Sequence, residues 1–160
     1  MKRAFNIIYP AACMLFIMLL GSCTDPQAVI DNNIALPDHN WSYVNRMRFD
    51  CKIDDEAAAY NLYLNLRVTD NYKYSNLFVL IYQSQPGSKA KVTRYELKLA
   101  AADGEWYGKG SGNLYSYQVP FKTNYKFPAK GSYHFEVEQN MRDNPLHEVS
   151  DVGLRVEKAK

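Results

Sequence analysis

The 160-residue sequence has almost no excess of charge of either sign. Lysine and arginine number 19, against 17 aspartates and glutamates. Lys2 and Arg3 lie in a segment that we predict below to be removed, which would leave 17 basic residues against 17 acidic ones. Affinity for the phosphate backbone of DNA or RNA comes mainly from clustered Lys and Arg side chains. The charge balance therefore argues against nucleic acid as a partner.

Motifs that build metal centres and catalytic sites are also lacking. The three histidines, His39, His134 and His147, do not share a metal-ligand spacing such as HExxH, and no GxSxG nucleophile motif is present. The acidic run 54–56 lacks the alternating oxygen ligands and central glycine of a calcium loop. The glycine-rich stretch 108–112 lacks the Lys-Ser or Lys-Thr pair of a phosphate-binding loop. We therefore expect no metal ion, no cofactor and no enzymatic activity.

A long hydrophobic run occurs at the N-terminus. It follows Lys2 and Arg3, extends from Ala11 to Leu20, and is succeeded by two small residues before Cys23. The run is shorter than the roughly 20 apolar residues that a membrane-spanning helix needs. This order is typical of a secretory signal, so we predict that residues 1–22 are a cleaved signal peptide.

The end of this signal, Leu20-Gly21-Ser22-Cys23, resembles the bacterial lipobox. In lipoproteins the thiol of that cysteine receives a diacylglycerol, and the new amino group is usually acylated, with palmitate as a typical chain. Each buried CH₂ contributes about 0.8 kcal/mol, so two or three acyl chains would hold the protein on a membrane. We predict lipidation of Cys23; the alternative is an ordinary cleaved signal in which this cysteine is incidental.

Cysteine is too rare to form an internal disulfide. Of the three cysteines, Cys13 would leave with the signal and Cys23 would carry lipid, so Cys51 would have no partner. Cys51 is in phase with apolar neighbours on a predicted strand, which indicates a small buried hydrophobic residue.

The segment after the predicted lipid site is polar. Residues 24–40 contain Pro26 and Pro37 and show no apolar period. We predict a lipidated N-terminus and flexible tether over 23–40, followed by one domain over 41–160. Asp25 is compatible with different sorting codes, so the membrane leaflet stays open.

From Trp41 onward apolar residues recur with a period of two, which indicates half-buried strands. The aromatic fraction is 14%, with 13 tyrosines, and this also favours strands. Apolar or alternating segments separated by turn-forming residues span 41–53, 60–68, 77–82, 92–99, 115–121, 133–141 and 152–156. The only helical candidate is one turn over 54–59. The pattern predicts an all-β fold, an antiparallel β-sandwich of jelly-roll or immunoglobulin-like type with seven or eight strands.

An aromatic cluster lies beside the glycine-rich stretch. Trp106 and Tyr107 precede it and Tyr115 follows it. Such rings can form a platform for sugar rings or a hot spot for a protein partner. The alternative is that Trp106 closes the end of the sandwich. Because the strand faces alternate between apolar and charged residues, we expect the loop 105–115, rather than a sheet face, to be the binding edge.

Several segments together resemble the gliding-motility lipoprotein GldH family of the Bacteroidetes. The resemblance is carried by 76–77, 104–110, 127–135, 138–142 and 151–158, together with the lipobox. It implies an envelope lipoprotein, expected in the outer membrane, that is associated with gliding motility and with a machinery that overlaps type IX secretion. It brings no catalytic residue, and because non-gliding members exist, it does not imply that the source cell glides.

Two classes of function remain open. The first is a non-catalytic component or accessory of the motility or secretion machinery, with other envelope proteins as partners. The second is a glycan-binding surface lipoprotein that uses Trp106, Tyr107 and Tyr115. Arg142, at a predicted strand end, is expected either to tie the connection 142–148 to the last strand or to bind a partner.

Overall fold

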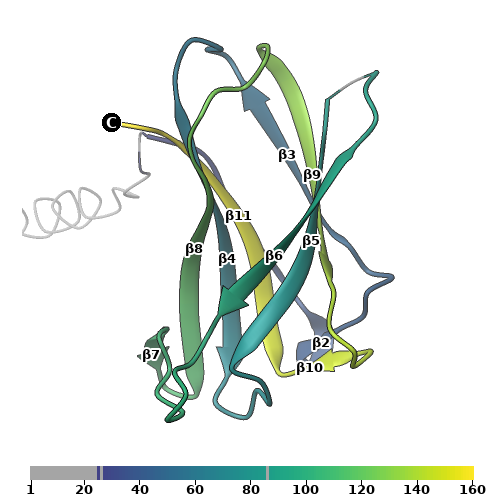
Figure 1. Cartoon of the computed structure of the whole chain (residues 1–160), viewed down its shortest axis with the longest axis vertical. Coiled ribbons are helices and arrows are strands. Elements are labelled where there is room, and N and C mark those ends of the chain that lie inside the picture. The colour runs from purple at the N-terminus through teal and green to yellow at the C-terminus, as the bar shows by residue number, and fades with distance from the viewer. Residues whose placement is uncertain (1–24, 26, 86) are drawn as a thin grey trace, which may run out of the picture.

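The protein is an antiparallel β-sandwich in the computed structural model, which describes Asp25, residues 27–85 and residues 87–160 (Figure 1). A five-stranded sheet has the order β1 (Ala28–Ala35), β11 (Val149–Lys158), β4 (Tyr60–Thr69), β8 (Leu114–Tyr125), β7 (Lys109–Ser111). A four-stranded sheet has the order β3 (Met47–Ile53), β9 (Gly131–Gln139), β5 (Asn76–Ser84), β6 (Lys91–Lys98). The short strands β2 (Asn40–Trp41) and β10 (Leu146–His147) pair with each other, and η2 (Pro37–His39) is a 3₁₀ turn. The predicted all-β sandwich is confirmed.

The predicted period of two matches the burial of the long strands. In β4, Leu62, Leu64 and Leu66 are buried, while the residues between them face outward. In β3, buried and exposed positions alternate from end to end. The inward side chains of both sheets form one core, and the fully buried residues within it include Trp41, Leu62, Leu64, Leu77, Phe135 and Leu154. One shared core explains why the two sheets stack face to face.

Cys51 lies in this core, as predicted from its phase on the strand. Burial raises the pKa of its thiol to about 12, because the thiolate would lose its hydration. The side chain therefore packs as a small hydrophobic group.

The structure corrects the predicted start of the domain. Residues Ala28 to Ala35 form the edge strand β1, which pairs with β11 from Ala28↔Glu157 to Ala35↔Asp151. The prediction of a flexible tether over 23–40 is therefore wrong from Ala28 onward, and the domain does not begin at Trp41. The reason is that an edge strand needs few apolar residues: Ile30 and Ile34 pack against the core, and the rest of β1 is mostly exposed.

Other expectations lie outside the described residues or differ from the structure. The signal peptide 1–22 and the lipidation of Cys23 fall on residues that the structure does not describe. Six of the seven predicted strands are present, while the first, over 41–53, is divided into β2 and β3 by the connection 42–46; β1, β7 and β10 are additional strands in the described ranges. The expected helical turn over 54–59 is absent. No helix in the described part of the chain has the length and apolar character needed to cross a bilayer.

The two ends of the sandwich carry different loops. We call the end where β1 begins and β11 finishes the terminal end; it also holds the connections 54–59 and 126–130 (Figure 1). The opposite end, which we call the distal end, holds η2 and the connections 42–46, 99–108 and 140–145. The connection 99–108, which carries Trp106 and Tyr107, therefore lies far from the N-terminus of the domain.

Candidate functional site

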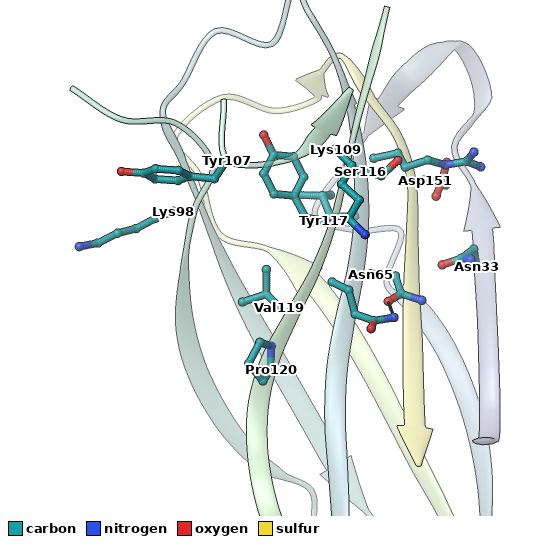
Figure 2. Close-up of a pocket in the computed structure, with 13 residues that line it drawn as sticks. Asn33, Asn65, Lys98, Tyr107, Lys109, Ser116, Tyr117, Val119, Pro120 and Asp151 are labelled. Carbon is teal, nitrogen blue, oxygen red and sulfur yellow. Dashed lines mark hydrogen bonds and ion pairs between the residues drawn. The ribbon is translucent and has the colours of Figure 1, made fainter. Parts of the chain in front are cut away.

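A hollow of about 820 Å³ lies on the outer face of the five-stranded sheet, toward the distal end (Figure 2). We call it the outer hollow. It is lined by Asn33, Asn65, Leu66, Arg67, Lys98, Tyr107, Lys109, Ser116, Tyr117, Gln118, Val119, Pro120 and Asp151. Its lining thus combines Lys98 of β6, Tyr107 before β7 and Lys109 of β7 with residues of β1, β4, β8 and β11, most of which face outward.

The hollow exists because β7 is short. β7 pairs with β8 only over Leu114 to Ser116, so from Tyr117 onward that side of β8 has no paired strand in the described ranges. Lys98 and Tyr107 stand beside this open edge (Figure 2). Pro120 lies on the same edge and has no backbone N–H to donate, which disfavours pairing with a further strand.

Tyr107 is held at the rim by its backbone. Its N–H donates to the carbonyl of Leu99 at 2.9 Å, and the hydroxyl of Tyr117 donates to the same oxygen at 2.9 Å. The chain at Gly108 crosses directly over the Tyr117 ring, where a Cβ atom would lie 2.6 Å from Cζ. Only glycine fits this crossing without displacing the ring. Tyr107, next to this crossing, is 63% exposed.

A row of carboxamides forms part of the floor. Asn33, Gly153, Asn65 and Gln118 are successive register partners on β1, β11, β4 and β8. Gln118 Nε2 donates to Asn65 Oδ1 at 3.1 Å, and Asn65 Nδ2 donates to Asp31 Oδ1 at 2.9 Å. Gly153 provides the space for the Asn33 side chain. The row presents amide donors and acceptors on one face of the sheet.

The next row carries charge. Asp151, Arg67, Ser116 and Lys109 are successive register partners on β11, β4, β8 and β7. The Asp151 carboxylate is buried; it accepts a hydrogen bond from Arg67 Nε at 2.6 Å and another from Ser150 Oγ at 3.1 Å. Arg67 is about half exposed and Lys109 is exposed. Arg67, Lys98 and Lys109 thus give the hollow three positive charges. Its one carboxylate, Asp151, is already paired with Arg67.

The predicted aromatic platform does not form as expected. Trp106 is half-buried, packs against the core and stacks on Tyr115, with ring centroids 5.2 Å apart and an interplanar angle of 29°. A β-bridge between Ala100 and Trp106 fixes this orientation, which turns the neighbouring Tyr107 outward. Trp106 is therefore only partly exposed, and Tyr107 is the exposed ring of the predicted binding edge. The expectation that a loop rather than a sheet face forms the binding edge stays a prediction; outward residues of the five-stranded sheet line the floor of the hollow.

The packing of Trp106 leads to a testable prediction. We expect Trp106→Ala to lower the free energy of unfolding by about 2 kcal/mol, since it removes the stacked ring of a half-buried residue. Tyr107→Ala, the matched control at the adjacent exposed position, should cost less than about 0.5 kcal/mol. Urea unfolding followed by circular dichroism measures both changes. Equal losses for the two variants would contradict the assignment.

Arg142 does not tie down the distal connection. It is exposed and makes no hydrogen bond or ion pair to any residue that the structure describes. Gln139 at the end of β9 holds this connection from the other side: its buried side chain donates to the carbonyl of Asp143 at 3.0 Å and accepts from the N–H of Met141 at 2.8 Å. Of the two roles expected for Arg142, the structural one is therefore not observed, and the partner-binding one stays a prediction.

Sequence reasoning missed most of the polar floor of the hollow. Asn33 falls within the predicted tether, and Asn65, Arg67 and Gln118 are not among the predicted site residues. Their outward phase on the strands is a usable signal, but the register that aligns them is not visible in the sequence.

In the described residues, no group of three or more His, Cys, Asp or Glu side chains is placed to hold a metal ion.

Comparison with known proteins gives the family. The family model described as "GldH lipoprotein" matches residues 28–156, from the start of β1 to within β11. The chain belongs to the GldH lipoprotein family. It is therefore a gliding-motility lipoprotein of the cell envelope, as the resemblance of segments such as 151–158 predicted.

Two GldH relatives align over most of their length. The gliding motility lipoprotein GldH homolog of Christiangramia forsetii is 30% identical over 166 residues, covering 99% of each chain. Gliding motility lipoprotein GldH of Flavobacterium johnsoniae is 30% identical over 151 residues, covering 90% of this chain and 92% of its own. A solved family GH115 4-O-methyl-α-glucuronidase is 11% identical, with a TM-score of 0.39 over 86% of this chain and 18% of that chain.

Proposed function

We propose that this GldH-family lipoprotein is a non-catalytic component or accessory of the gliding-motility machinery and of the type IX secretion system that overlaps it. It is anchored in the outer membrane through acylated Cys23 after removal of residues 1–22, and it binds other envelope proteins. The family match carries the proposal, because it spans the β-sandwich from β1 to β11. That domain is therefore the part of the chain that performs the family's role.

The position of β1 supports a defined orientation. Five residues, Cys23 to Gln27, precede β1, and an extended chain spans at most about 3.6 Å per residue. The terminal end therefore lies within roughly 18 Å of the lipid attachment point. The distal end points away from the membrane, where a partner can reach it.

The distal end also holds exposed apolar side chains. Among the described residues, five large hydrophobic residues are exposed: Val29, Tyr43, Val44, Val92 and Tyr107. Two of them, Tyr43 and Val44, lie on the connection 42–46 next to the distal connection 140–145, where the Tyr43 N–H donates to Asn144 Oδ1 at 3.1 Å, and Val44 is 72% exposed. An exposed tyrosine is a typical anchor of protein interfaces, and an adjacent exposed apolar residue extends the patch. We place the envelope partner on this surface, centred on Val44.

Co-purification of the full-length lipidated protein tests the proposal. We expect envelope proteins of the motility or secretion machinery to be recovered in mild detergent, and soluble sugars should not release them. Val44→Asp should reduce recovery at least tenfold, since a charge at the centre of an apolar contact must be desolvated. Val92→Asp, an exposed valine on β6, is the matched control and should leave recovery unchanged. Recovery no higher than from a Cys23→Ala strain would overturn the proposal.

A further inference from the structure

We infer that the outer hollow is a binding site for a carboxylate-bearing glycan. This inference goes beyond the proposed function, because it gives the protein a second class of ligand on a surface separate from Val44. It relies on the charge of the hollow, on the two polar rows of the sheet and on the exposed ring of Tyr107.

The charge of the hollow favours an anion. Asp151 is buried and already accepts hydrogen bonds from Arg67 and Ser150. Its charge is therefore matched by Arg67, and the charges of Lys98 and Lys109 are left over. A chain with nearly balanced total charge thus has a local excess of positive charge at one concave surface. Such a surface attracts anionic ligands.

The charged row offers a specific place for a carboxylate. Ser116 lies between Lys109 and Arg67 on adjacent strands, so the backbones of the two basic residues are about 10 Å apart. Arg67 extends toward Asp151 on β11, and Lys109 is the basic side chain that lies beside Ser116 (Figure 2). Arg67 uses Nε for Asp151, and its two Nη groups make no hydrogen bond within the described ranges. Nη groups, an ammonium and a hydroxyl are suitable donors for a carboxylate.

The remaining lining favours a sugar over an acidic peptide. The carboxamides of Asn33, Asn65 and Gln118 supply donors and acceptors next to the charged row, which suits the many hydroxyls of a sugar. Tyr107 adds an exposed aromatic face at the rim beside Lys98 (Figure 2). A peptide strand would instead add to the open edge of β8, where Pro120 cannot donate a hydrogen bond. The volume of about 820 Å³ is within the usual range for small-ligand sites, enough for a short stretch of sugar chain.

Titration calorimetry on the detergent-solubilised full-length protein tests the inference with three probes: trigalacturonate, neutral maltotriose and triglutamate. We expect trigalacturonate to bind in low salt, with affinity falling as salt rises, and maltotriose and triglutamate to bind at least tenfold more weakly. Lys109→Ala and Tyr107→Ala should each weaken trigalacturonate binding at least tenfold. Lys73→Ala removes another exposed distal lysine and should have no effect.

Each contrary outcome overturns a stated part of the inference. Equal binding of triglutamate would make the hollow a site for acidic peptides. Equal binding of maltotriose would show that the positive charges do not contribute to recognition. If trigalacturonate did not bind, the hollow would not be a glycan site. Thermal unfolding of each variant verifies that it is folded. Co-purification of envelope proteins depends on Val44 and is measured separately, so the two proposals can fail independently.

Discussion

Gly153→Ala is expected to lower the free energy of unfolding by about 3 kcal/mol. A Cβ atom at this position would lie 1.8 Å from Oδ1 of Asn33 and 2.6 Å from the backbone oxygen of Asn32. The Asn33 side chain could rotate away, but the Asn32 carbonyl belongs to β1 and can move only if the strand moves. The substitution therefore separates β1 from β11. Urea unfolding of the full-length protein measures the loss.

Gly110→Ala is the matched control for this prediction. A Cβ atom there would lie 3.4 Å from Cε1 of Tyr115, an ordinary van der Waals contact, and the φ angle of Gly110 is not in the left-handed region. Its cost should stay below about 1 kcal/mol, because alanine also reduces the entropy of the unfolded chain. If the two substitutions had the same effect, close approach of β1 to Gly153 would not be the cause.

Arg67→Ala is expected to cost about 3 kcal/mol, because it leaves the buried carboxylate of Asp151 without its cation. The Asp151 side chain is only 3% exposed, so water cannot fully replace the guanidinium. Arg48→Ala is the matched control: Arg48 pairs with Glu136 at 3.1 Å, but its side chain is 78% exposed. An exposed pair of this kind contributes less than about 1 kcal/mol.

The double variant Arg67→Ala/Asp151→Ala tests the cause of this loss. Removing both partners removes the uncompensated buried charge, so the double variant should be more stable than Arg67→Ala alone. Chemical denaturation of the single and double variants gives the coupling between the two side chains. If the double variant were less stable than Arg67→Ala, the unpaired Asp151 carboxylate would not be the cause of the lost unfolding free energy.

The long strands could be predicted from the sequence because each buries one face. In β4 and β3 the apolar residues recur at every second position, and the structure buries those residues. β1 could not be predicted in the same way. It is an edge strand with two apolar residues facing the core, Ile30 and Ile34, and Asp31 to Asn33 between them have the composition of a loop. Its stability comes from pairing with β11, which is a long-range contact.

The candidate site was less predictable than the fold. The aromatic loop was found from composition, but which of two adjacent rings faces solvent depends on the bridge between Ala100 and Trp106. Arg67, Lys109 and Asp151 are far apart in the sequence, and only the register of β11, β4, β8 and β7 brings them into one row. Pairing register is a property of the assembled sheet, so local patterns do not contain it.

The central claim is that the distal end of the sandwich docks on the motility or secretion machinery. Site-specific photo-crosslinking in intact cells tests it most directly, with a photoreactive amino acid placed at Val44 or, as the terminal-end comparison, at Val92. The account predicts that the probe at Val44 crosslinks the lipoprotein to an envelope protein of that machinery, and that the probe at Val92 does not. Crosslinks to that machinery from Val92 but not Val44, or from neither position, would contradict it.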